Sequence, residues 1–140
     1  MQRVEVTQEF SAPVDRVYGH LAKHENLEQV FGAKITRLRD GDTTPDGVGS
    51  VRRMKVSPLL PPFEETVTQA VPNELIEYRI TKGSPLKDHV GVMRFSTVGS
   101  GTRLDYTIEF DSKVPGAGGA LKRAIEKNVR SGLAQMAAEL

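Results

Sequence analysis

The chain has 140 residues, of which 38% are hydrophobic and 26% charged, and its 19 basic and 18 acidic side chains leave a net charge of +1. This size and composition predict one globular domain over residues 1–140, and the near-neutral charge, without long runs of Lys or Arg, argues against a nucleic-acid partner. The absence of cysteine excludes disulfides and thiolate metal ligands. The opening residues, MQRVEVTQEF, lack the apolar stretch of a signal peptide or membrane span, so we expect a cytoplasmic protein without integral membrane insertion.

The first part of the chain predicts one strand followed by a helical region. Val4, Val6 and Phe10 share one side of an alternating pattern, with polar residues on the other side, as in a half-buried strand. Residues 11–32 then repeat apolar side chains at helical spacing, and Gly32 is expected to end this region. The pattern fits two short helices.

Residues 34–111 change to a period of two and predict six consecutive antiparallel strands, separated by turn signals such as VPNE and VGSG. The first of these turns places Val67 opposite Tyr78, and the second places Met93 opposite Tyr106. One face of the sheet is therefore expected to be apolar, carrying Val67, Val71, Ile76, Tyr78, Ile80, Met93, Phe95, Leu104, Tyr106, Ile108 and Phe110.

The stretch SKVPGAGGALKRAIEK, residues 112–127, allows two interpretations, a phosphate-binding loop or a hinge. A P-loop requires Gly-x4-Gly-Lys followed by Ser or Thr, and here the Lys is displaced and no hydroxyl follows it. We therefore favour a hinge between the sheet and a long amphipathic helix. The apolar positions of that helix are Leu121, Ile125, Val129, Leu133 and Met136.

The order of these elements, with the stretches GVGSVRRMKV, EETVTQAVPNELIEYRITKG and GTRLDYTIEF, resembles the START-like (Bet v 1-like, SRPBCC) superfamily, in its polyketide cyclase/dehydrase and lipid-transport branch. The resemblance spans nearly the whole chain. It implies an α+β helix-grip fold, in which a seven-stranded antiparallel sheet curves around the long C-terminal helix, with two short helices between strands 1 and 2. It also implies a cavity between sheet and helix. Members bind lipids, sterols, polyketides and other apolar molecules, and a minority are enzymes.

We expect the apolar face of the sheet and one side of the last helix to line this cavity. Tyr78 and Tyr106 could orient a carbonyl or hydroxyl group of a ligand, although tyrosines on half-buried strands are also common core residues. Methionines would add flexible apolar lining, or simply fill the core. The predicted ligand-binding residues are Phe10, Met54, Val67, Tyr78, Met93, Phe95, Tyr106, Ile108, Phe110, Ile125 and Val129.

The loop SPLLPPFEE places Leu59, Leu60 and Phe63 among prolines, where a connection would normally be polar. These side chains could cover the mouth of the cavity as a lid, meet a partner, or cap one end of the core.

Candidates for catalysis are Tyr78, Tyr106 and His89, as acid, base or orienting groups. His89 at a strand start is equally consistent with a solvated side chain. Arg53 and Arg94 lie within strands, and an inward Arg could polarise a carbonyl, but the face assignment turns Arg94 outward.

No metal site or cofactor is predicted. His20 and His24 stand four residues apart on a helix, but the general-base Glu of the zinc-protease pattern is missing, and His24 is expected to be exposed near a helix end.

Three functions remain open. The first is binding of an apolar small molecule, lipid or polyketide-like, in the cavity. The second is a cyclase or dehydratase acting on such a molecule, which requires at least two of the three candidate groups to converge in one pocket. The third is an interaction protein with a filled core, which could form a homodimer through a sheet edge or the PLLPP loop.

Overall fold

One sheet of seven antiparallel strands is the framework of the protein in this computed structural model, which describes residues 1–56, 61–84 and 86–140. The strand order is β1-β7-β6-β5-β4-β3-β2, so the first strand pairs with the last and the others follow in chain order. The strands are β1 (Gln2–Phe10), β2 (Lys34–Arg39), β3 (Val51–Lys55), β4 (Phe63–Val71), β5 (Leu75–Lys82), β6 (Leu86–Val98) and β7 (Gly101–Ser112).

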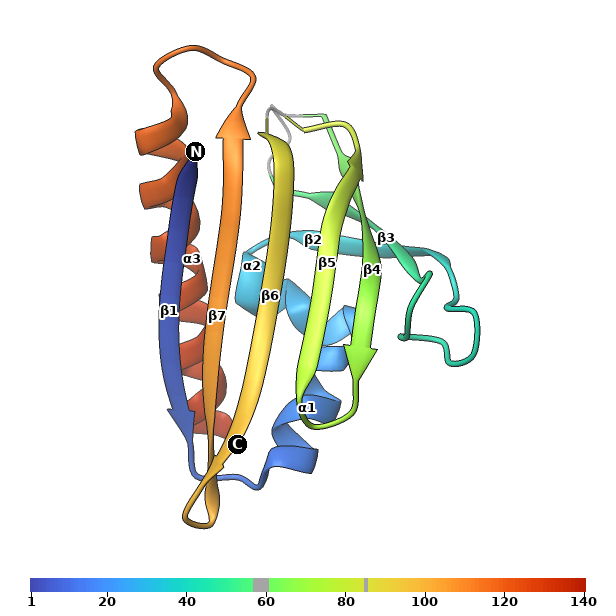
Figure 1. The fold of residues 1–140 in the computed structure, drawn as a ribbon, viewed down its shortest axis with the longest axis vertical. Helices are drawn as coiled ribbons and strands as arrows, with labels where there is room; N and C mark the ends of the chain where they lie inside the picture. The colour runs from blue at the N-terminus through green and yellow to red at the C-terminus, as the bar shows by residue number, and fades with distance from the viewer. Residues whose placement is uncertain (57–60, 85) are drawn as a thin grey trace.

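The helices all lie on one side of this sheet. They are α1 (Val14–Ala22), a 3-10 turn (His24–Asn26), α2 (Leu27–Phe31) and α3 (Gly118–Glu139). In Figure 1, α3 runs along the sheet behind β1 and β7, while α1 and α2 lie behind β5 and β6. The α+β helix-grip arrangement is therefore confirmed, including the two short helices between strands 1 and 2. No helix within the described ranges is both long and apolar enough to cross a membrane.

Helices α2 and α3 touch through their backbones. A Cβ atom at Gly132 of α3 would lie 2.6 Å from the Cα of Val30 and 2.7 Å from its carbonyl oxygen. Only glycine permits this approach, because any side chain would push the helices apart. The C-terminal half of α3 is therefore fixed against α2. Leu133 and Met136, next to this contact, are fully buried.

The inner face of the sheet follows the sequence pattern closely. Val67 is opposite Tyr78 and Met93 is opposite Tyr106, as predicted. The prediction that Val71 lies on this apolar face is wrong, because its side chain is 40% exposed. The register of β4 shifts between Val67 and Gln69, and this irregularity turns every later side chain of the strand to the opposite face.

The connection between β7 and α3 covers residues 113–117, and Gly116 there adopts a positive φ of 79°. This conformation costs glycine little and explains its presence in the stretch. The role of the connection as a hinge stays a prediction.

His24 is fully buried, contrary to the prediction of an exposed imidazole. The Ser50 hydroxyl donates to the carbonyl of Gly47 at 2.6 Å, so its oxygen accepts from Nε2–H of His24 at 3.1 Å. The ring thereby ties the 3-10 turn to the loop before β3. Nδ1 is buried and has no partner among the described residues. Burial, with the nearby Arg52 cation, lowers the pKa of His24 to about 4.

This buried imidazole predicts a loss of stability in mild acid. Between the ordinary histidine pKa of 6.5 and the folded value of about 4, the unfolded chain binds a proton at His24 and the folded chain does not. The contribution of neutral His24 to the free energy of unfolding should therefore be fully present above this window. It should be lost as the pH is lowered through the window, by on the order of 2 kcal/mol. Urea unfolding of the wild type and of His24→Gln, which cannot titrate, isolates the effect. A wild-type advantage that stays constant across the window would contradict it.

Candidate functional site

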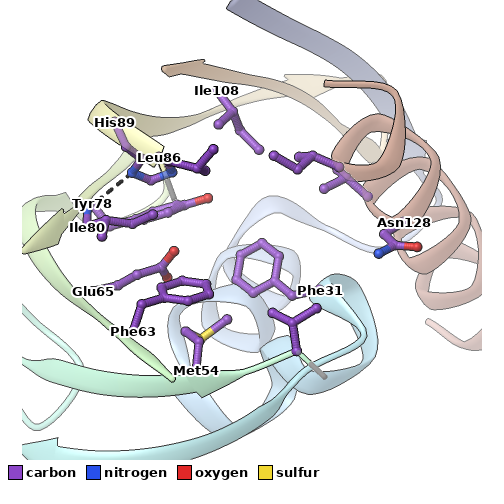
Figure 2. Close-up of a pocket in the computed structure, with 13 residues that line it drawn as sticks. Phe31, Met54, Phe63, Glu65, Tyr78, Ile80, Leu86, His89, Ile108 and Asn128 are labelled. Atoms are coloured by element: carbon purple, nitrogen blue, oxygen red, sulfur yellow. Dashed lines mark hydrogen bonds between the residues drawn. The ribbon is translucent and has the colours of Figure 1, made fainter. Parts of the chain in front are cut away.

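A cavity of about 110 Å³ lies between the inner face of the sheet and α3. Its apolar wall combines side chains of α2, β3, β4, β7 and α3: Phe31, Met54, Phe63, Ile108, Ile125 and Val129. Ile80, Leu86 and Val56 complete the apolar lining. Its polar residues are Glu65, Tyr78, His89 and Asn128. Figure 2 shows the first three together on the sheet side, facing α3 across the cavity.

Several predicted ligand-binding residues line this cavity. They are Met54, Tyr78, Ile108, Ile125 and Val129, together with Phe63 of the proposed lid and His89 of the proposed catalytic set. The structure places the others, Phe10, Val67, Met93, Phe95, Tyr106 and Phe110, in the buried core outside the lining. Leu59 and Leu60 lie outside the described residues.

Phe95, one of these core residues, is separated from the cavity by α1. Its Tyr18 ring packs edge-on against Phe95, with 5.2 Å between ring centroids. Helix α1 thus fills the space beside Phe95, whereas the cavity is lined by Ile80, late in β5, and by Leu86, the first residue of β6. Contact of the six core residues with a ligand stays a prediction.

A buried ion pair stands at the sheet wall. Arg52 of β3 and Glu65 of β4 are opposite each other in the sheet and are only 2% and 5% exposed. Nε of Arg52 donates to Oε1 of Glu65 at 2.9 Å, and Nη2 lies 2.8 Å from the same oxygen without hydrogen-bond alignment. The guanidinium also lies over the Tyr78 ring, 4.9 Å from its centroid. Carboxylate and aromatic face together compensate the buried cation.

Tyr78 and Tyr106 are joined through their hydroxyl groups by a hydrogen bond. Burial raises the pKa of both phenols, and the Glu65 carboxylate raises them further, so both stay protonated near neutral pH. The Tyr78 ring lies directly over Gly91, where a Cβ atom would come within 2.2 Å of its Cζ. The missing side chain at Gly91 makes room for the tyrosine.

His89 holds one defined tautomer. The backbone N–H of Ile80 donates to Nδ1 at 3.1 Å, and since an N–H can only donate, the proton of the neutral ring is on Nε2. Burial lowers the pKa of His89, and the Arg52 charge also acts in this direction, opposed by Glu65. The ring is therefore a neutral hydrogen-bond donor on the cavity wall. Its centroid is 5.5 Å from that of Tyr78.

The whole chain, residues 1–140, matches the family described as polyketide cyclase / dehydrase and lipid transport. The chain belongs to this family. No curated protein matches it.

Solved structures share the fold of this polyketide cyclase/dehydrase and lipid-transport family member. A protein from Thermus thermophilus has a TM-score of 0.78 and 18% identity, over 99% of this chain and 98% of that one. The Zhui aromatase/cyclase from Streptomyces sp. R1128 has a TM-score of 0.74 and 23% identity, over 96% and 92%. The Aha1 dimer from Colwellia psychrerythraea has a TM-score of 0.74 and 15% identity, over 100% and 96%. At these identities the likeness establishes the fold alone.

Sequence reasoning missed Arg52 and Glu65, although it considered an inward arginine. Arg53 and Arg94 are both exposed, and the buried arginine is Arg52. The period of two contained the signal, because Arg52 alternates in step with Met54. Glu65 likewise shares its side of β4 with Phe63 and Val67.

The packing of Tyr78 over Gly91 in this family member is directly testable. Gly91→Ala forces the ring away and breaks the hydrogen bond to Tyr106, so the free energy of unfolding should fall by about 2–3 kcal/mol. Gly19→Ala is the control: a Cβ atom there meets nothing within 4 Å, and in the interior of α1 alanine should leave stability unchanged or raise it by up to about 1 kcal/mol. Chemical denaturation compares the two variants. Equal stability of both would show that the ring can move without cost.

Proposed function

We propose that the protein binds an apolar small molecule, lipid or polyketide-like, in the cavity between the sheet and α3. The observation that carries this proposal is the composition of the wall: nine apolar side chains surround one group of hydrogen-bonding residues on the sheet side. Apolar walls with a few convergent polar groups are typical of small-molecule sites. The family description, polyketide cyclase / dehydrase and lipid transport, supports the same class of ligand.

The size of the cavity limits what enters without rearrangement. Its volume of about 110 Å³ is below the roughly 300 Å³ from which ligand pockets normally start. A small ring system would fit with little movement, whereas a longer chain requires the lining to shift. Ile125 and Asn128 belong to the first half of α3, away from the close contact at Gly132. We therefore expect this part of α3 to move when a larger ligand binds.

Catalysis on such a ligand is the second candidate. This candidate is supported by Tyr78 and His89, two of the three candidate groups, which both line the cavity; Tyr106 is outside the lining and is hydrogen-bonded to Tyr78. The likeness to an aromatase/cyclase favours this candidate. The protonation states favour binding over catalysis. Both phenols and Nε2 of the neutral His89 carry a proton, and Nδ1 of His89 accepts from a backbone N–H, so none of these groups is ready to act as a base. Glu65 is the acidic group of the described lining, and it is paired with Arg52.

An interaction protein with a filled core is the weakest candidate, because the cavity is present. Homodimer formation is a separate proposal, supported by the fold shared with the Aha1 dimer. Sedimentation at increasing concentration tests it.

Filling the cavity should weaken the binding of an apolar probe. Ile125→Trp extends a lining side chain into the space, and binding of naphthylmethanol, followed by its fluorescence, should weaken at least about tenfold. Val98→Trp is the control, because Val98 is 50% exposed and lies outside the lining. Native mass spectrometry with organic extraction, applied to the wild type, identifies any molecule that copurifies. Equal affinity of the two tryptophan variants would place the binding site elsewhere.

A further inference from the structure

We infer that Glu65 sets the charge preference of the cavity, so that it takes neutral ligands bearing a hydroxyl or carbonyl group and rejects carboxylates. This inference rests on the proposed binding function and specifies its ligand class. It follows from the order in which a ligand would meet the two charges of the buried ion pair.

The carboxylate, and not the guanidinium, is part of the cavity wall. Glu65 lines the cavity, and Figure 2 shows its oxygens beside Phe63 and below the Tyr78 hydroxyl. Arg52 does not line the cavity. Its guanidinium lies against the face of the Tyr78 ring, and its Nε donates a hydrogen bond to Glu65. A ligand thus approaches the anion first, and the cation behind it is already compensated.

A second anion in this space would meet no Lys or Arg among the residues that line the cavity, and the nearby Arg52 is already paired with Glu65. The charged and titratable groups around Glu65 are Arg52 from β3, Tyr78 from β5, His89 from β6 and, through Tyr78, Tyr106 from β7. His89 is neutral and both phenols are protonated, so Arg52 is the cation of this group. Two carboxylates sharing one low-dielectric site repel strongly, and one of them must take up a proton. A bound carboxylate ligand would be the second carboxylate beside Glu65, so its binding would carry this cost.

A neutral oxygen group matches the wall instead. Nε2–H of His89 offers a donor, because Nδ1 is occupied by the backbone N–H of Ile80. Glu65 offers an acceptor. A hydroxyl group both accepts and donates, and it can satisfy the two residues together, while a carbonyl group satisfies His89. The chemical class is therefore an apolar alcohol, phenol or ketone, and not a free fatty acid.

The test compares two probes of equal size and different charge, naphthylmethanol and naphthoate, at neutral pH. The wild type should bind the alcohol at least about tenfold more tightly than the acid. Glu65→Gln removes the anion and leaves Arg52 unpaired. The dissociation constant of naphthoate divided by that of naphthylmethanol should therefore fall about tenfold or more. Glu64→Gln is the matched control: it makes the same charge change one residue away, on the outer side of β4, where Glu64 faces Arg53 and Lys82.

A double variant keeps the test decisive if Glu65→Gln does not fold. Arg52→Met with Glu65→Gln removes both charges, and replacement of a whole buried pair is usually tolerated. The preference for the alcohol should then rank wild type first, the double variant second and Glu65→Gln last. An equal ratio in the wild type and the double variant would overturn the role of Glu65, while leaving the cavity as a binding site. If the wild type bound neither probe, the proposed function itself would fail.

Discussion

The backbone contact between α2 and α3 at Gly132 determines where this fold can hold a ligand. The inner face of the sheet is apolar and needs a cover, and two separate helical segments provide it. Where they meet, at Gly132 and Val30, no space remains. Toward its N-terminal end, α3 presents Val129 and Ile125 to the sheet across a gap, and Phe31 at the end of α2 faces the same gap. The cavity is the space between the inner face of the sheet, this part of α3 and the end of α2.

The ion pair beside this cavity is difficult to explain as a source of stability. Taking both charges of Arg52 and Glu65 out of water costs several kcal/mol per ion, and a pair of well-packed apolar residues is often as stable or more so. The surrounding structure nevertheless accommodates the pair: the Tyr78 ring covers the guanidinium, and Gly91 makes room for that ring. A role of the Glu65 carboxylate in ligand selection, as inferred above, would explain why the pair is present.

The sequence predicted the sheet more reliably than the site, for physical reasons. A period of two reports the face of each side chain, and the pairs Val67 with Tyr78 and Met93 with Tyr106 follow once the turns are recognised. Val71 failed because a register shift within β4 leaves no clear mark in the residue types. The division of the apolar face into core and cavity depends on where α1 and α3 lie, as Phe95 under Tyr18 illustrates. Strand periodicity carries no information about that placement.

Charged residues are uncommon on the buried face of a sheet. Here the buried pair Arg52 and Glu65 favours ligand binding over acid-base catalysis. A cyclase needs a base to remove a proton as well as donors to stabilise the oxyanion that results. The wall supplies donors in His89 and Tyr78, because burial keeps the imidazole neutral, with its proton on Nε2, and raises the pKa of the phenol. A base would have to be Glu65, and its Oε1 is already bound by Arg52. Taking up a proton would neutralise Glu65 and leave the buried Arg52 cation without its counterion, whereas orienting a neutral oxygen group leaves the charges of the wall unchanged. The same residues that make the cavity selective therefore make it a better binding site than a site for acid-base catalysis.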